Sequence, residues 1–264
     1  MYLLCMRMFG VLFVCSFFSA TAVQAGAWTL PEGEGQAIVT LAYSFASDAF
    51  DDDGSPISIE PFEKYELRGY AEYGLTDWAT LAVQPEFRFI DQGEEDSEGL
   101  GRFDLGLRTR VWHDDYAVAS IEGSVSAPGQ SDDLAPLNGS DTDWELEARA
   151  LYGRGFDLWS RHGFVDLQVG YRHRFSDPAD EVLADLTFGI DVTERSLAVV
   201  QSFNRISVGS ARLPFDETQE HKIAVSTVYR VDDQWSLQAG SFATAYGRNV
   251  LRERGFFVAL WSAF

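Results

Sequence analysis

Apolar and polar residues alternate along most of the chain, and residues 66–89 show this pattern most clearly. In the first arm of this segment the odd positions are apolar or small, and the even positions are nearly all polar. The second arm keeps the same parity after a turn at residues 74–77. Because side chains alternate between the two faces of a strand, this period of two predicts a hairpin with one apolar and one polar face.

The same alternation recurs along the chain and predicts about twelve strands, an even number as in bacterial outer-membrane barrels. The segment 197–206 is the weakest of them, because four consecutive apolar residues at 197–200 blur the alternation. Longer polar stretches at 46–61, 90–100, 128–142, 154–162, 207–219 and 246–253 are predicted as loops or turns. The predicted strands are 36–45, the two arms of 66–89, 101–111, 116–127, 143–153, 165–175, 182–192, 197–206, 221–230, 235–245 and 254–264.

The polar face of these strands carries Glu and Arg repeatedly along the whole chain. In a soluble β-sandwich that face would lie outside, in water. Apolar residues outside and charged residues inside are typical of a transmembrane, antiparallel, up-and-down β-barrel of the outer-membrane type. Short turns near Asp77, Asp114, Glu194 and Asp233 predict the periplasmic end, and the longer acidic connections predict the external end. Pro85 lacks a ladder donor and predicts a local bulge or a gap in pairing.

The first 25 residues predict a cleaved signal peptide, with Arg7, a short apolar run at 9–18 and small residues before Gly26. That run is too short for a membrane-spanning helix, which needs about 20 apolar residues. The predicted domains are therefore a signal at 1–25 and a barrel at 26–264, with 27–35 as a periplasmic lead-in. Both cysteines, Cys5 and Cys15, lie in the signal, which excludes disulfides and thiol catalysis in the barrel.

The net charge of the 264-residue chain is −21, and it becomes −22 once Arg7 leaves with the signal. Such a charge disfavours nucleic acid, because neutralising phosphates needs clusters of Lys and Arg. It favours neutral or cationic ligands and divalent ions. The acidic runs at 51–53 and 94–98 are either Ca²⁺ or Mg²⁺ sites or solvated loops beside lipopolysaccharide, where ambient divalent ions bridge charges.

The inward-facing charges are the candidate functional residues. They form either a salt-bridged ladder that fills and rigidifies a narrow barrel, or a lining that selects a small polar solute as charged rings do in pores. The candidate lumen-lining residues are Glu66, Arg68, Glu72, Glu86, Arg88, Arg102, Asp104, Arg108, Arg110, Glu145, Glu147, Arg149, Arg172 and Arg174.

The sequence predicts no enzyme and no cofactor. The four histidines, His113, His162, His173 and His221, are scattered, and none has a metal-ligand spacing. A hydrolase would need a nucleophile, a base and an orienting group at one place. The nearest local set is His173 with Ser176 and Asp177.

Three stretches resemble, in order, a family of bacterial outer-membrane proteins named for the MetA pathway of phenol degradation. They are YGLTDWATLAV at 73–83, GLGRFDLGLRTRVW at 99–112 and VSAPGQSDD at 125–133. The chain departs from the family pattern at Arg102, where an acid is usual. Phe264 resembles the C-terminal aromatic residue that the outer-membrane assembly machinery recognises.

The resemblance implies an integral outer-membrane protein of a Gram-negative bacterium that transports small molecules, with hydrophobic or aromatic compounds as candidates. Its expected partners are outer-membrane lipid and lipopolysaccharide, the assembly machinery and a small solute, without nucleic acid. The alternative hypothesis is a structural or adhesive barrel whose lumen is filled by side chains.

Overall fold

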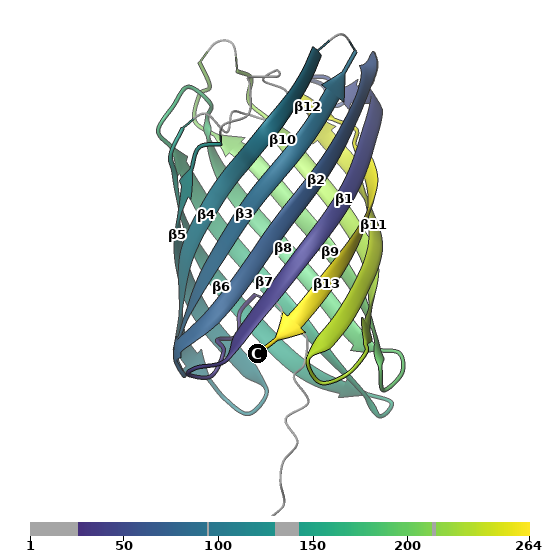
Figure 1. The fold of residues 1–264 in the computed structure, drawn as a ribbon. Coiled ribbons are helices and arrows are strands. Elements are labelled where there is room, and N and C mark those ends of the chain that lie inside the picture. Colours follow the sequence, from purple (N-terminus) through teal and green to yellow (C-terminus); the bar gives the residue numbers. More distant parts are fainter. Residues whose placement is uncertain (1–25, 94, 130–142, 213–214) are drawn as a thin grey trace, which may run out of the picture.

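Strands follow one another up and down the molecule, and each pairs with its sequence neighbours through antiparallel ladders (Figure 1). The computed structural model describes residues 26–93, 95–129, 143–212 and 215–264. The prediction of an all-β barrel of twelve strands is confirmed. Thirteen strands carry labels, but the short β12 and the longer β13 pair with successive parts of β1 and so occupy one strand position in the barrel. The strands are β1 Gly35–Phe50, β2 Pro56–Thr76, β3 Ala79–Gln92, β4 Glu95–His113, β5 Ala117–Ala127, β6 Glu145–Leu158, β7 Arg161–Arg174, β8 Asp180–Asp191, β9 Ser196–Val208, β10 Gln219–Arg230, β11 Trp235–Arg248, β12 Val250–Leu251 and β13 Arg254–Ala263.

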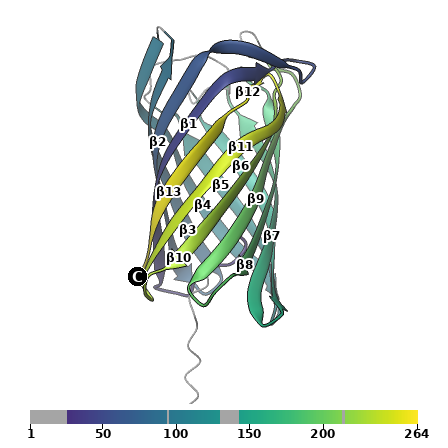
Figure 2. The same ribbon diagram turned by 90° about the vertical axis from the view of Figure 1, so that its right-hand side faces the viewer.

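The barrel closes between its first and last long strands, β1 and β13, which lie side by side in Figure 2. Their register runs without a shift from Gln36 opposite Ala263 to Phe45 opposite Arg254. Gly35 and Phe264 exchange two backbone hydrogen bonds at the end of this seam, with N···O distances of 2.7 and 2.9 Å. β1 also pairs with β2, so closure removes the open sheet edges that would otherwise template aggregation.

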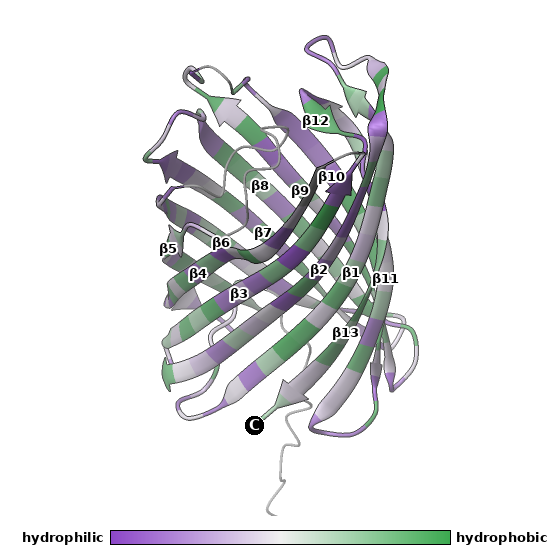
Figure 3. Ribbon diagram, turned by 45° about the horizontal axis from the view of Figure 1, so that its top comes forward, coloured by the Kyte–Doolittle hydropathy of each residue, from purple (hydrophilic) through white to green (hydrophobic). Residues whose placement is uncertain are grey.

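Large apolar side chains cover the outside of the barrel, and most of the polar and charged side chains of the strands face the inside. Leu105 and Val169 keep 40% and 59% of their surface exposed, whereas the inward Ser44 and Thr80 keep 1% and 0%. Hydropathy accordingly alternates along the strands in Figure 3. This arrangement suits a barrel that spans a membrane, with its apolar side chains against lipid. Within the described residues, no helix is long and apolar enough to cross a membrane.

Exposed tryptophans mark both ends of the apolar belt. Trp78, Trp112 and Trp235 lie at or beside the short turns, and Trp144 lies toward the opposite end, just before β6. Aromatic girdles at both interfaces are a regular feature of outer-membrane barrels. The positions of these four rings therefore agree with short turns at one membrane surface and longer connections at the other.

Several predicted loops are wrong, because the strands continue beyond the apolar belt. β1 and β2 run through the predicted loop 46–61 and leave only residues 51–55 as a turn. β3 and β4 run through 90–100 and leave a short turn that includes Gly93, whose φ is 69°. Acidic residues in these stretches suggest loops, yet the backbone there pairs in antiparallel ladders. Glu94, most of the predicted loop 128–142 and the predicted signal 1–25 lie outside the described residues.

The connection between β6 and β7 is another correction. The predicted turn 154–162 is a two-residue turn at Trp159 and Ser160, whose φ angles are 49° and 64°. Two consecutive positive φ angles are what a type I′ hairpin turn requires, and Asn or Gly usually fill these positions. Trp159 and Ser160 carry no such signal, so the sequence does not reveal the tight turn.

The predicted irregularity at Pro85 is confirmed. The register between β3 and β4 shifts between Pro85 and Phe87, which forms a bulge. On the other side of β3, Gly69 of β2 faces the proline ring, and a Cβ at position 69 would lie 3.0 Å from Pro85 Cγ. Glycine is therefore the residue that lets β2 pass the proline ring closely.

A single carboxylate closes the turn between β4 and β5, outside the membrane-spanning part. Asp114 Oδ1 accepts hydrogen bonds from the backbone N–H groups of Tyr116 at 2.8 Å and Ala117 at 2.7 Å. These two bonds favour the ionised carboxylate and lower the pKa of Asp114 from its ordinary value. The turn is therefore best held when Asp114 is charged.

Candidate functional site in the barrel lumen

Cavities lie in the lumen among the described residues, and shared lining residues connect three of them. A cavity of about 730 Å³ occupies the end with the short turns, and Phe164 lines both this cavity and a second one of about 450 Å³. A third cavity of about 440 Å³ adjoins the second. The second and third cavities share the lining residues Ile38, Arg68, Tyr70, Thr187, Gln201, Phe203, Arg205 and Trp261.

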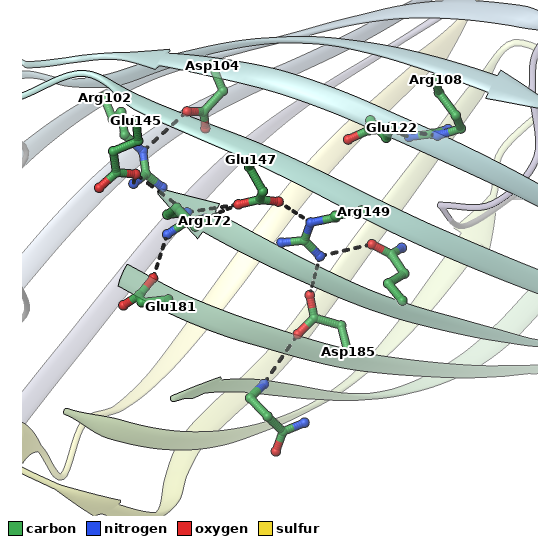
Figure 4. A network of polar contacts seen from close by, with 12 residues as sticks. Arg102, Asp104, Arg108, Glu122, Glu145, Glu147, Arg149, Arg172, Glu181 and Asp185 are labelled. Carbon is green, nitrogen blue, oxygen red and sulfur yellow. Dashed lines mark hydrogen bonds and ion pairs between the residues drawn. The ribbon is translucent and has the colours of Figure 1, made fainter. Parts of the chain in front are cut away.

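Ion pairs join β4, β6, β7 and β8 into one network on the wall of the third cavity (Figure 4). Arg172 is at its centre, with 2.7 Å to Glu147 and 3.0 Å to Glu181. Arg174 reaches the same Glu181 at 2.5 Å and Glu145 at 3.2 Å. All five side chains are less than one-tenth exposed. Removing one partner of such a buried pair costs about 3–5 kcal/mol, because the other charge is left uncompensated.

The network extends in both directions from this centre. Arg102 reaches Glu145 at 2.6 Å and Asp104 at 3.2 Å. Arg149 contacts Glu147 and lies 2.6 Å from Asp185. The structure thus brings together half of the fourteen predicted residues, namely Arg102, Asp104, Glu145, Glu147, Arg149, Arg172 and Arg174.

A second cluster surrounds Arg108, whose side chain is 4% exposed. Its Nη1 lies 2.8 Å from Glu72, and its Nη2 lies 2.9 Å from Glu122. Nη1 also donates a hydrogen bond of 3.0 Å to the carbonyl oxygen of Trp28. Arg108 therefore links three barrel strands to the segment that precedes β1.

That segment corrects the predicted periplasmic lead-in, because residues 27–30 lie inside the barrel end. The Ala27 N–H donates to Asp166 at 2.7 Å, and the Ser120 hydroxyl donates to the Ala27 carbonyl at 2.6 Å. The Trp28 ring meets Phe164 edge-on, with centroids 6.0 Å apart. Phe164 lines both the first and the second cavity, and Trp28 packs against it at the wall of the first, so the two rings narrow the path between these cavities.

A third cluster lies farther along the lumen on β2, β3, β10 and the residues before β13. Arg68 contacts Glu66 and lies 3.6 Å from Glu86, which in turn lies 3.8 Å from Arg88. Glu66 also lies 3.4 Å from Lys64. The predicted residues Glu66, Arg68, Glu86 and Arg88 thus form their own group, apart from the network around Arg172.

Glu253 completes this third cluster, although the sequence places it in a loop. Its carboxylate is 2% exposed and accepts a hydrogen bond of 2.5 Å from the Ser44 hydroxyl. It also lies 2.7 Å from Lys222 Nζ and 3.2 Å from Lys64 Nζ. The break between β12 and β13 removes the alternation that would have revealed its inward direction.

Arg110, the remaining predicted residue, belongs to none of these clusters. It lines the cavity at the end with the short turns, together with Asp114, Asp191 and Arg230. Other charged residues also line the lumen. Glu122 and Asp185 have the inward direction that the alternation predicts for them, although they are not among the fourteen candidates. Lys64, Glu181, Arg205 and Lys222 were not predicted.

The opposite wall of the lumen is apolar and aromatic. The second cavity is lined there by half-buried side chains of β1, β9, β11 and β13. Trp261 is held in place because its Nε1 donates to Gln238 Oε1 at 3.1 Å. The lumen therefore has an ion-paired wall and a mainly aromatic wall. The second wall includes Ile38, Phe203, Phe242, Phe257 and Trp261, and β10 adds the ion-paired Glu220 and Lys222 between β9 and β11.

The set His173, Ser176 and Asp177 is not assembled as a catalytic group would be. His173 Nδ1 lies 3.0 Å from Asp180, and its ring packs against Phe175. Asp177 lies beside Arg212 at 3.7 Å.

In the acidic turn at residues 51–55, the Asp51 carboxylate accepts hydrogen bonds from the backbone N–H groups of Asp53 and Ser55. No group of three possible metal ligands occurs among the described residues.

No family model and no curated protein matches the sequence. Solved structures do resemble the chain in fold. The COG4313 outer membrane channel from Pseudomonas putida F1 has a TM-score of 0.73 and 18% identity, covering 92% of this chain and 100% of that one. The KdgM porin has a TM-score of 0.52 and 6% identity, and the match covers 86% of this chain and 99% of that one. The NanC porin has a TM-score of 0.52 and 8% identity, and the match covers 85% of this chain and 98% of that one. The fold is thus that of integral outer-membrane barrels.

Proposed function

We propose that this protein is an outer-membrane channel for small molecules. The observation that carries the proposal is the series of cavities along the lumen, linked through shared lining residues and bordered by ionised side chains. A filled structural barrel would not need such a series. The barrel fold that this chain shares with the channel and the porins described above supports the proposal.

The aromatic wall supports the finer part of the proposal, that hydrophobic or aromatic compounds pass through the lumen. A solute in the second cavity contacts Phe203, Phe242 and Phe257 on one side and charged groups on the other. Binding pockets for small molecules are usually mostly apolar, with a few placed polar groups. Resemblance to the phenol-degradation family points to the same class of solute.

The proposal extends to the surroundings of the barrel. The apolar belt contacts outer-membrane lipid, and the strands that rise above it carry acidic residues next to lipopolysaccharide. Phe264 is 64% exposed, so its ring is accessible to the assembly machinery. We propose these contacts as the partners of the barrel.

The second candidate function is a structural or adhesive barrel. It is favoured by the dense ion pairing around Arg172 and by Trp28 inside the lumen, because both fill space that a channel needs. Pairs of this kind are rigid, and they hold the wall of the barrel in place.

Single-channel recording in planar bilayers and liposome swelling distinguish the two functions. We expect the refolded protein to conduct in small steps and to admit small solutes, with heat-unfolded protein as the control. If neither the protein nor its Trp28→Ala variant conducts or admits a solute, the structural function replaces the channel.

A further inference from the structure

Arg205 differs from the ion-paired arginines of the lumen. It lies in β9 on the inward parity of Leu197 and Val199, which are 3% and 6% exposed, and it lines both the second and third cavities. Its side chain is exposed within the lumen. In the described part of the chain, its guanidinium forms no ion pair and no hydrogen bond, whereas Arg68, Arg108 and Arg172 each contact two carboxylates or more.

The acids near Arg205 are already engaged with other cations. Glu220 lies opposite Arg205 on β10 but is 3.2 Å from Lys222 Nζ. Asp185 faces the same cavity and is 2.6 Å from Arg149. On β8, the residue opposite Arg205 is the buried Leu183. Arg205 therefore presents an available cation to whatever enters the lumen.

Apolar surface adjoins this cation. Phe203 precedes Arg205 by two residues, so both side chains lie on the same face of β9, and both line the second cavity. Trp261 and Ile38 line the same cavities, and Phe242 and Phe257 extend the surface along the second. A guanidinium binds a carboxylate through two parallel N–H···O bonds, and aromatic side chains pack well against another ring.

We propose that Arg205 and the aromatic wall form a binding site for a small organic anion with an apolar body, such as an aromatic monocarboxylate. The carboxylate pairs with Arg205, and the ring lies against Phe203 and Trp261. The cavity of about 450 Å³ is within the usual range for small-molecule sites. This inference deepens the proposed function and rests on it, because solutes reach Arg205 through the lumen.

The site reverses an expectation drawn from net charge. A chain with a charge of −21 favours neutral or cationic ligands when the charge is considered as a whole. Within the described lumen, however, the acids that line this cavity are paired with other cations, whereas the guanidinium of Arg205 is exposed and has no carboxylate partner. A ligand in this cavity interacts most strongly with the charges nearest to it, so the Arg205 cation favours an anionic ligand.

The test is a titration of small-molecule probes into the complete barrel in detergent micelles. Binding is monitored through the NMR signal of the Trp261 indole N–H. The probes are sodium benzoate, benzyl alcohol, which keeps the ring without the charge, and sodium acetate, which keeps the charge without the ring. The indole signal of Trp159, which is 89% exposed at a hairpin tip, reports any partition of the probe into the micelle. Trp261→Phe assigns the signal.

We expect benzoate to shift the Trp261 signal in a saturable way without a parallel shift at Trp159. Benzyl alcohol and acetate should bind at least ten times more weakly. Arg205→Gln should weaken benzoate binding at least tenfold, and Arg205→Lys should retain part of it. Arg254→Gln is the matched control, because Arg254 lies at an exposed, outward-facing position of β13, and it should change the affinity less than twofold.

Equal binding of benzoate and benzyl alcohol would overturn the proposal, and so would unchanged benzoate binding in Arg205→Gln. If the Arg205 variants do not fold, the comparison of the three probes on the unmodified protein decides the matter. Binding in micelles does not need conduction. Benzoate binding without any channel in bilayers would refute the proposed function and keep the site, whereas conduction without benzoate binding would refute the site alone.

Discussion

Arg108 Nη1 donates a hydrogen bond of 3.0 Å to the carbonyl oxygen of Trp28, across 80 residues of sequence. The same guanidinium holds Glu72 on β2 and Glu122 on β5. One side chain thus combines two tasks, because it joins charges across the wall and keeps the segment before β1 inside the barrel. The position of Trp28 at the wall of the first cavity follows from this anchor and from its edge-on contact with Phe164, which lines the first and second cavities.

Trp28→Ala should widen the path through the lumen. Removal of the ring takes away the edge-on partner of Phe164 and joins the first cavity to the second. We expect a higher single-channel conductance, on the order of twofold, measured in planar bilayers. Trp159→Ala is the matched control, since that ring is 89% exposed on a hairpin tip, and its conductance should equal that of the unmodified protein. An unchanged conductance in Trp28→Ala would show that the narrow part lies elsewhere.

Leu105→Arg should destabilise the barrel by about 2–4 kcal/mol, because it places a charge on the lipid-facing side near the middle of the apolar belt. Leu75→Arg is the matched control, since Leu75 is 45% exposed beside a short turn, where the cost should be about 0–1 kcal/mol. Urea unfolding in lipid vesicles measures both. Equal destabilisation at the two positions would show that Leu105 does not face lipid near the middle of the apolar belt.

Glu147→Gln and Arg149→Gln should shift ion selectivity in opposite directions. Loss of the Glu147 charge leaves Arg149 and Arg172 in excess, so anions are favoured, whereas loss of the Arg149 charge leaves Glu147 and Asp185 in excess, so cations are favoured. Reversal potentials across a salt gradient measure the shift. The double variant removes one charge of each sign and should return close to the original selectivity. Two shifts in the same direction would contradict an ion path beside this pair.

Asp114 should make the β4–β5 turn sensitive to acid. Its pKa is lowered in the folded protein, so its contribution to stability is complete above the ordinary carboxyl pKa of about 3.9 and is lost as pH falls through the lower folded value. Hydrogen exchange at the Tyr116 and Ala117 amides should therefore lose protection in that acid range. Asp114→Asn keeps an acceptor that does not titrate, and it should show no such pH dependence. The same loss of protection in both proteins would exclude Asp114 as the cause.

Strand parity explains how much of the fold the sequence reveals. Leu105 and Arg108 face opposite sides of β4 because they are three positions apart, an odd offset, and this rule needs only local sequence. It places most of the inward charges without knowledge of the structure. The rule becomes weak where apolar residues face inward, as Leu197 and Val199 do, and this is why Arg205 on the same strand was not recognised.

Features that depend on distant contacts were beyond the sequence. Trp28 precedes the first strand, and its segment is placed in the lumen by hydrogen bonds donated by Arg108 and Ser120 and by one that Asp166 accepts. Glu253 follows a break between strands, so parity does not apply to it. The extended β1–β2 hairpin was missed for another reason. The acidic residues at 51–53 led the sequence to predict a loop over 46–61, whereas β1 and β2 continue through most of that stretch.

The seam between β1 and β13 has a consequence for the kinetics of folding. β1 can pair with β2 early, but its other edge is satisfied only by residues from the opposite end of the chain, beginning with Gln36 opposite Ala263. Contacts between such distant residues form slowly, because the loop between them must close first. An unclosed barrel therefore keeps the β1 edge open, and this intermediate is the species that pairs with other copies and aggregates. The intermediate is consumed when β13 pairs with β1.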